Sequence, residues 1–181
     1  TSLNPVMTIG KQMEEVFRFH KGMTRAQSRE MSVRMLRLVN IALPEQRMNE
    51  YPHQLSGGMR QRVMIAMALS CSPGLLIADE PTTALDVTIQ AQILDLMKKL
   101  GKDLGASIML ITHDLGVVAE ICSRALILYC GQIVEEIMTK DLFSPLHPYT
   151  RGLLDSLPGP GREGKLHVIP GAVPGARDFP G

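Results

Sequence analysis

The sequence has no tryptophan and few aromatic residues, and its positive and negative charges nearly cancel. A surface that stacks bases needs aromatic side chains, and a surface that attracts phosphates needs an excess of basic charge. Aromatic residues make up only 4% of the chain, and the formal net charge is +1. The composition therefore does not favour a protein that binds nucleic acid or an anionic membrane.

Cysteine is also scarce, and the three residues Cys71, Cys122 and Cys130 stand apart from one another in apolar runs. A zinc site would need close Cys/His pairs, which this spacing excludes. We expect the three cysteines to be small buried hydrophobic residues in a reducing compartment.

Long apolar runs are missing as well. The longest, 63–78, is interrupted by "SCSPG" and predicts a helix, a turn and a strand instead of a membrane span. Residues 1–5 are neither basic nor apolar, so no signal peptide is expected there. We therefore expect a cytosolic chain, and a first residue other than Met is what a fragment or processed chain would show.

The sequence does contain a change of periodicity near residue 75. Apolar residues recur at helical spacing before it, whereas a strand, a helix and a second strand are predicted after it. The continuous apolar run "LLIA" is typical of a strand that is buried on both faces. The predicted helices are 8–21, 24–41, 57–70 and 87–104, and the predicted strands are 75–79 and 107–112.

These elements predict an α/β protein in which a helical lobe is followed by a parallel-sheet α/β lobe. A short helix over 115–122 and a hairpin of strands 125–129 and 132–137 are expected next. Residues 158–181 are rich in proline and glycine and predict a tail without a core of its own.

Asp79 and Glu80 end the strand "LLIAD" as adjacent carboxylates. Ligands of parallel sheets bind at the carboxyl ends of the strands. An aspartate there can hold Mg²⁺ and an adjacent glutamate can orient or deprotonate a water molecule. The alternative is a solvated acidic turn.

Two further segments suit a phosphate ligand. In "LSGG", 55–58, the glycines allow close approach of the backbone, and the next helix offers its N-terminus to an anion. The alternative is a plain helix start capped by Ser56. His113 follows the second strand, so we expect it at the same edge as Glu80, where it could contact a phosphate; the alternative is a structural histidine.

A phosphate loop of the form G-x-x-x-x-G-K-[ST] is absent. The nearest match, "GPGREGKL" at 159–166, has Leu166 in place of the hydroxyl residue. No buried strand precedes it and Pro170 prevents a long helix after it. We therefore expect no Walker A residues in this chain.

In combination, "LSGGMRQR" at 55–62, "LLIADEPTTALD" at 75–86 and "ITHD" at 111–114 resemble the nucleotide-binding subunits of ABC transporters. Met59 and Thr83 depart mildly from the usual glutamine and serine. The resemblance implies an ABC-type nucleotide-binding domain that is incomplete, because the phosphate loop and the Q-loop glutamine would precede Thr1. A sheet that lacks the strand before the phosphate loop should have an open apolar edge and an unpaired face.

The resemblance also implies the role of each site residue. Asp79 would hold the metal in the Walker B position, and Glu80 and His113 would be the catalytic carboxylate and the switch histidine. The signature motif, which would contact the nucleotide of the opposing subunit, comprises Leu55, Ser56, Gly57 and Gly58. The D-loop comprises Ala84, Leu85 and Asp86.

Segments at the two ends of the chain make the resemblance more specific. "TSLNP" at 1–5 and "PLHPYTRGLLDSLP" at 145–158 resemble the importers of oligopeptides, dipeptides and nickel. The implied division is a helical signature lobe at 1–72, a RecA-like lobe at 73–144 and an importer-type C-terminal extension at 145–181.

The implied function is ATP hydrolysis coupled to the uptake of peptides or nickel, with ATP and Mg²⁺ as cofactors. The implied partners are a second ATPase subunit, transmembrane permease subunits and, indirectly, an extracytoplasmic substrate-binding protein, but no nucleic acid. The protein would lie at the cytoplasmic face of the membrane, and the chain alone would be inactive. The alternatives are a soluble ABC-type ATPase acting on nucleic acid or ribosomes and a non-catalytic module that docks to a permease.

Overall fold

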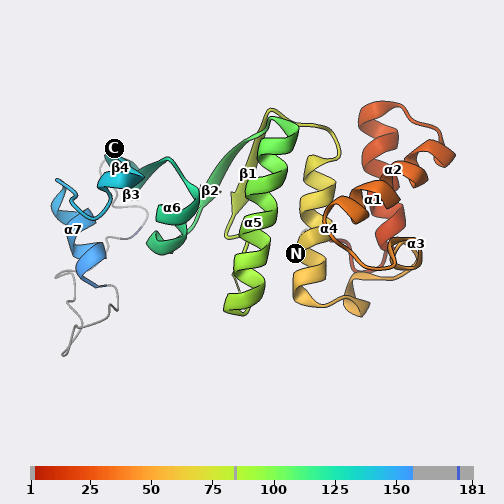
Figure 1. The fold of residues 1–181 in the computed structure, drawn as a ribbon, viewed down its shortest axis with the longest axis horizontal. Helices are drawn as coiled ribbons and strands as arrows, with labels where there is room; N and C mark the ends of the chain where they lie inside the picture. The colour runs from red at the N-terminus through yellow and green to blue at the C-terminus, as the bar shows by residue number, and fades with distance from the viewer. Residues whose placement is uncertain (1–2, 84, 157–174, 176–181) are drawn as a thin grey trace. The chain divides into compact units, whose positions relative to one another are not determined.

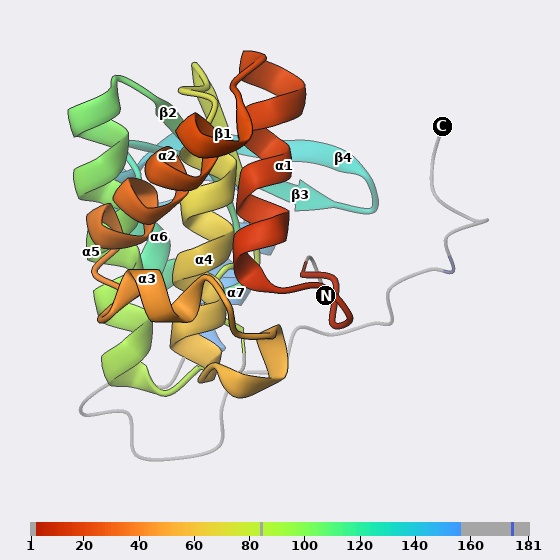
Figure 2. The same cartoon turned by 90° about the vertical axis from the view of Figure 1, so that its right-hand side faces the viewer.

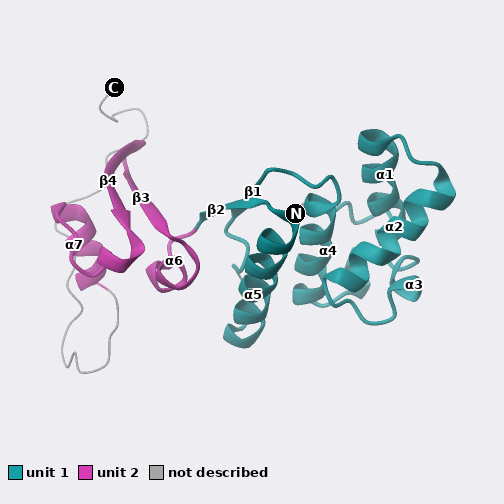
Figure 3. Ribbon diagram, turned by 45° about the horizontal axis from the view of Figure 1, so that its top comes forward, with its two compact units in different colours: residues 1–111 teal, residues 112–181 magenta. Residues whose placement is uncertain are grey.

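The computed structural model describes residues 3–83, 85–156 and 175 (Figure 1). The chain forms two compact units, 1–111 and 112–181, which Figure 3 shows in separate colours. The three-part division implied by the resemblance, with boundaries after residues 72 and 144, stays a prediction. None of the helices in the described ranges is both long and apolar enough to cross a membrane.

The first unit is a group of helices packed against a small sheet. Local sequence explains where several of its helices begin and end. Thr24, Ser56 and Asp86 cap three of them, each accepting a hydrogen bond from a backbone N–H of the first turn. The elements in chain order are α1 (Ile9–Lys21), α2 (Arg25–Leu38), α3 (Pro44–Arg47), η1 (Pro52–Gln54), α4 (Gly57–Leu69), β1 (Leu75–Asp79), α5 (Val87–Leu104) and β2 (Ser107–Ile111).

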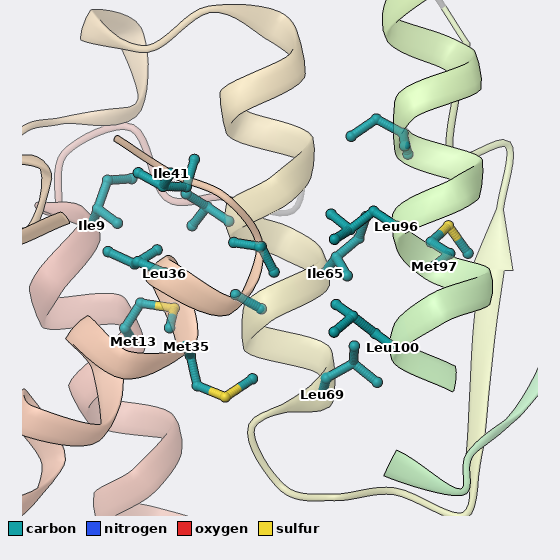
Figure 4. Close-up of a cluster of buried hydrophobic side chains, with 14 of the residues drawn as sticks. Ile9, Met13, Met35, Leu36, Ile41, Ile65, Leu69, Leu96, Met97 and Leu100 are labelled. Atoms are coloured by element: carbon teal, nitrogen blue, oxygen red, sulfur yellow. The ribbon is translucent and has the colours of Figure 1, made fainter. Parts of the chain in front are cut away.

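Helix α4 occupies the centre of the first unit, between α5 on one side and α1 and α2 on the other (Figures 1 and 2). In Figure 4, Ile65 and Leu69 of α4 face Leu96 and Leu100 of α5. These side chains and those of α1 and α2 belong to one continuous apolar cluster. Its buried members from the first two helices and the following segment include Ile9, Met13, Phe17, Met35, Leu36, Val39 and Ile41.

Truncating this core should destabilise the protein strongly. Leu100 is 1% exposed, and Leu100→Ala is expected to lower the free energy of unfolding by about 2–5 kcal/mol through lost burial and a residual cavity. Urea denaturation measures the change. Leu104→Ala on the same helix is the matched control, because Leu104 is 39% exposed and should lose much less. Equal losses in the two variants would contradict this account of the core.

The sheet of the first unit consists of β1 and β2, paired in parallel with Leu75 opposite Ser107 and Asp79 opposite Ile111. The prediction that β1 is buried on both faces is wrong. Alternate residues point to opposite faces, and in the described part of the chain only one face packs against helices. The other face leaves four apolar residues 43% to 60% exposed, as expected for a sheet with an unpaired face: Leu75, Ile77, Met109 and Ile111.

The second unit packs helices against an antiparallel hairpin. The hairpin turns at Cys130 and Gly131, whose φ angles of 48° and 80° suit the tight turns that join antiparallel strands. Its elements are α6 (Leu115–Ile121), β3 (Arg124–Tyr129), β4 (Gln132–Met138), η2 (Thr139–Asp141) and α7 (Pro148–Asp155). Its buried apolar cluster comprises Leu115, Ala125, Ile127, Ile137 and Leu142.

Glu135 of β4 holds the start of α7 in place. One of its carboxylate oxygens accepts hydrogen bonds from the backbone N–H groups of Leu146 at 2.8 Å and His147 at 3.2 Å. Partial burial raises the pKa of Glu135, but the Thr150 hydroxyl, the two backbone donors and the charge of His147 lower that pKa below its ordinary value. The segment "PLHPYT" is thus fixed to the hairpin by an ionised carboxylate.

The prediction that the three cysteines are buried is also wrong, because all of them are partly exposed and none forms a disulfide. Each lies where a regular element ends: Cys71 after α4, Cys122 after α6 and Cys130 in the hairpin turn. An apolar sequence neighbourhood therefore did not ensure burial. Partial burial still raises the pKa of the Cys122 thiol.

Candidate functional site

Asp79 and Glu80 lie at the carboxyl end of the parallel sheet. Asp79 is the last residue of β1 and is exposed. The backbone N–H of Glu80 donates to the carbonyl oxygen of Ile111 at 2.9 Å, so the link to β2 extends one residue beyond β1. Glu80 has a φ of 47°, a left-handed conformation that is uncommon outside glycine and often marks functional sites.

The turn after β1 determines how the Glu80 side chain lies. The Thr83 hydroxyl donates a hydrogen bond to Oε2 of Glu80. The Thr83 backbone N–H donates to the Glu80 carbonyl oxygen at 3.3 Å, which closes the turn. The side chain of Glu80 is therefore held by the turn that follows it, and the solvated-turn alternative does not describe this geometry fully.

Residues 55–58 form the entry to α4. Leu55 is 5% exposed and anchors the segment in the core. Ser56 is exposed, and its hydroxyl oxygen accepts from the backbone N–H of Met59 at 3.3 Å. Gly57 and Gly58 form the first turn of the helix, whose leading N–H groups have no partner within the helix. The segment is a capped helix start, as one alternative expected, and such a start can also receive an anion.

The segment 84–86 connects the turn at Glu80 to α5. Ala84 lies outside the described residues. Asp86 caps α5 by accepting from the backbone N–H of Ile89 at 2.9 Å. A Cβ built on Gly57 would lie 3.3 Å from Cδ2 of Leu85, so the structure brings the 55–58 and 85–86 segments into direct contact.

His113 belongs to the second unit and is exposed. It directly precedes Asp114, which caps α6 by accepting from the backbone N–H groups of Gly116 at 2.9 Å and Val117 at 3.2 Å. That His113 shares an edge with Glu80 stays a prediction.

An open cleft of about 320 Å³ lies between α4 and β1 in the first unit. Its lining is apolar except for Gln61 and Asp79 and includes Met64, Met67 and Ile77. Binding sites for a triphosphate need basic groups or a nest of backbone N–H groups. Because no basic side chain lines the cleft, we do not interpret it as a phosphate site.

Asp79 fits a role as one ligand of Mg²⁺. Nowhere in the described ranges do three or more His, Cys, Asp or Glu side chains gather as a metal cage would require. Mg²⁺ in nucleotide sites commonly takes one or two protein carboxylates and completes its shell with water and phosphate oxygens. An exposed carboxylate at a strand end matches that pattern. The rejected loop "GPGREGKL" and the rest of the predicted tail lie outside the described residues, apart from Gly175.

Sequence reasoning missed Arg62 and Ile89 as supports of the site. Arg62 lies one turn beyond Gly58 on α4 and donates to the Val39 carbonyl oxygen at 3.0 Å and to Oε1 of Gln92 at 3.1 Å. Ile89 packs against Gly58. A sequence signal existed for each, since Arg62 lies within "LSGGMRQR" and Ile89 shares the apolar spacing of α5. Neither signal indicates which helix faces which.

Comparison with known proteins gives two family matches in this chain. The family model described as "ABC transporter" matches residues 1–83. The model described as "Oligopeptide/dipeptide transporter, C-terminal region" matches residues 134–181.

Curated relatives match nearly the whole chain. It is 59% identical over 99% of its length to the oligopeptide transport ATP-binding protein AppD of Bacillus subtilis. It is 53% identical over 99% of its length to the oligopeptide transport ATP-binding protein OppD of Salmonella typhimurium. The chain spans about half the length of these relatives, 56% of the first and 54% of the second.

Among solved structures, the chain is similar to the ATP-binding cassette MJ0796, described as a dimer in a post-hydrolysis state bound to ADP and Pi. The TM-score is 0.64 at 32% sequence identity. The match covers 76% of this chain and 59% of the other.

Proposed function

We propose that this chain belongs to the ABC transporter family and that the natural protein carrying it is the ATP-binding subunit of an importer of peptides. The observation that carries the proposal is that one chain matches both the ABC transporter model and the C-terminal region of oligopeptide/dipeptide transporters. The second match supports a peptide substrate over nickel, because its description names peptides.

Hydrolysis would take place at the carboxyl end of β1. Asp79 would hold Mg²⁺, directly or through water, and Glu80 would orient the attacking water and accept its proton. When bound at Asp79, Mg²⁺ would supply positive charge that offsets the negative charge developing on the phosphates. The Thr83 hydroxyl would keep the Glu80 carboxylate in one orientation. His113 would contact the terminal phosphate.

The signature motif would serve the nucleotide of a second subunit. The first turn of α4 presents backbone N–H groups and the positive end of the helix dipole, which suit a γ-phosphate. Ser56 would add its hydroxyl, while Leu55 keeps the segment anchored in the core. The active form would therefore be a dimer, homomeric or heteromeric, with two composite sites.

Coupling to transport requires permease subunits in the membrane. The protein would bind to their cytoplasmic side, and an extracytoplasmic substrate-binding protein would deliver the peptide. The pathway for the peptide would belong to the permease.

Uptake by vesicles tests this function. The natural protein, its permease and its binding protein are reconstituted, and uptake of a labelled dipeptide, a labelled pentapeptide and Ni²⁺ is measured with and without ATP. We expect ATP-dependent uptake of peptide and none of Ni²⁺. Nickel uptake alone, or ATP turnover that needs DNA or ribosomes instead of the permease, would overturn the proposal.

A further inference from the structure

The first turn of α4 lies directly on the beginning of α5. A Cβ built on Gly58 would be 2.7 Å from Cγ2 of Ile89, closer than real Cβ contacts come. A Cβ built on the neighbouring Gly57 would be 3.3 Å from Cδ2 of Leu85, a looser contact. The two helices remain side by side further along, where Ile65 faces Leu96 (Figure 4).

Gly58 is needed here for space, since its backbone does not require glycine. It lies in regular helix, and the described glycines with positive φ are Gly22, Gly105 and Gly131. Its missing side chain leaves room for the branched side chain of Ile89, whose rotamer in a helix is strongly restricted. Ile89 is further held by the hydrogen bond from its N–H to the Asp86 cap. The Ile89 side chain is therefore a rigid packing surface for the first turn of α4.

A second contact one turn along supports the same alignment. Residues three and four apart share a helix face, so Arg62 follows Gly58 on α4 and Gln92 follows Ile89 on α5. The guanidinium of Arg62 donates to Oε1 of Gln92 at 3.1 Å and to the Val39 carbonyl oxygen at 3.0 Å. The register of α4 on α5 is thus defined by a steric contact at the motif and a polar contact behind it.

We propose that Ile89 is a positioning residue for the signature motif. It sets where the N–H groups of the first turn of α4 and the Ser56 hydroxyl point relative to the 80–86 segment. This inference rests on the proposed function, in which the two segments serve different nucleotides of the dimer. The contact between Gly58 and Ile89 then links two parts of different sites. The signature motif serves the partner's nucleotide, and the 80–86 segment serves the chain's own nucleotide.

Compensating substitutions test the contact in the natural protein with its partner subunits. In Gly58→Ala the new methyl group collides with Ile89 and displaces the first turn. We expect kcat/KM for ATP to fall by about a hundredfold, the effect of a displacement of about 1 Å in a catalytic arrangement. In Gly58→Ala combined with Ile89→Ala, the nearest remaining atom of residue 89 is the Cβ at 4.0 Å, an ordinary contact. The double variant should therefore recover most of the loss.

Ile89→Ala alone separates positioning from general stability. It should raise the KM for ATP more than it lowers kcat, because a loosened signature turn must be ordered on the partner's nucleotide while Glu80 is untouched. Val87→Ala in the same helical turn is the matched control, since Val87 is 84% exposed and should change neither constant.

The outcomes decide between the two proposals. Failure of the double variant to exceed Gly58→Ala, or a kcat effect without a KM effect in Ile89→Ala, would overturn the role of Ile89. If Gly58→Ala does not fold, the KM and kcat of Ile89→Ala still decide the matter. A natural protein whose turnover does not depend on Glu80 would instead overturn the proposed function.

Discussion

Glu80→Gln should lower the ATP turnover of the natural protein by about 10²–10⁴-fold, the usual contribution of a general base. Glutamine keeps the size of the side chain and an oxygen that can accept from the Thr83 hydroxyl. It cannot accept a proton from the attacking water at neutral pH. Chemistry should therefore stop while nucleotide binding persists, which phosphate release and binding of a fluorescent ATP analogue measure separately.

The same variant should accumulate the ATP-bound dimer. If hydrolysis opens the dimer, a subunit that binds but does not hydrolyse ATP stays closed, and gel filtration with ATP and Mg²⁺ should show a larger species. Glu15→Gln is the matched control, because Glu15 is an exposed carboxylate on α1. Turnover that is unchanged in Glu80→Gln would remove Glu80 from the catalytic role.

The 181-residue chain by itself should show no Glu80-dependent ATP turnover. Its sequence has no phosphate loop, and "GPGREGKL" lacks the hydroxyl residue that the loop requires. The backbone nest and lysine that such a loop supplies hold the β- and γ-phosphates. Without them, neither the metal at Asp79 nor the water at Glu80 would have a bound triphosphate to act on.

A background control is needed to interpret the absence of ATP turnover in the 181-residue chain. The chain and its Glu80→Gln form are purified in the same way, and their phosphate release is compared at equal concentration. Circular dichroism checks that both have the same overall helix content. Turnover in the chain that its Glu80→Gln form lacks would show that these residues bind and hydrolyse ATP unaided, against our expectation.

Much of the local structure was predictable because its causes lie close together in the sequence. Ser56 and Asp86 are cap residues immediately before apolar periodic segments, and each begins a helix in the structure. The strand "LLIAD" ends at Asp79, just before the turn at Pro81, as expected. The resemblance to ABC transporter subunits was also predictable, because the motifs that carry it are short, ordered runs of sequence.

The sequence by itself therefore determined where most of the helices and strands lie, which family the chain resembles and which side chains are candidates for chemistry. Only the tertiary structure decided that Ile77 is exposed, that Glu80 adopts a left-handed backbone, and that Ile89 fills the space beside Gly58. The physical reason is that caps and periodicity act within a few residues. Burial and steric fit depend instead on which distant segment comes to lie on each face.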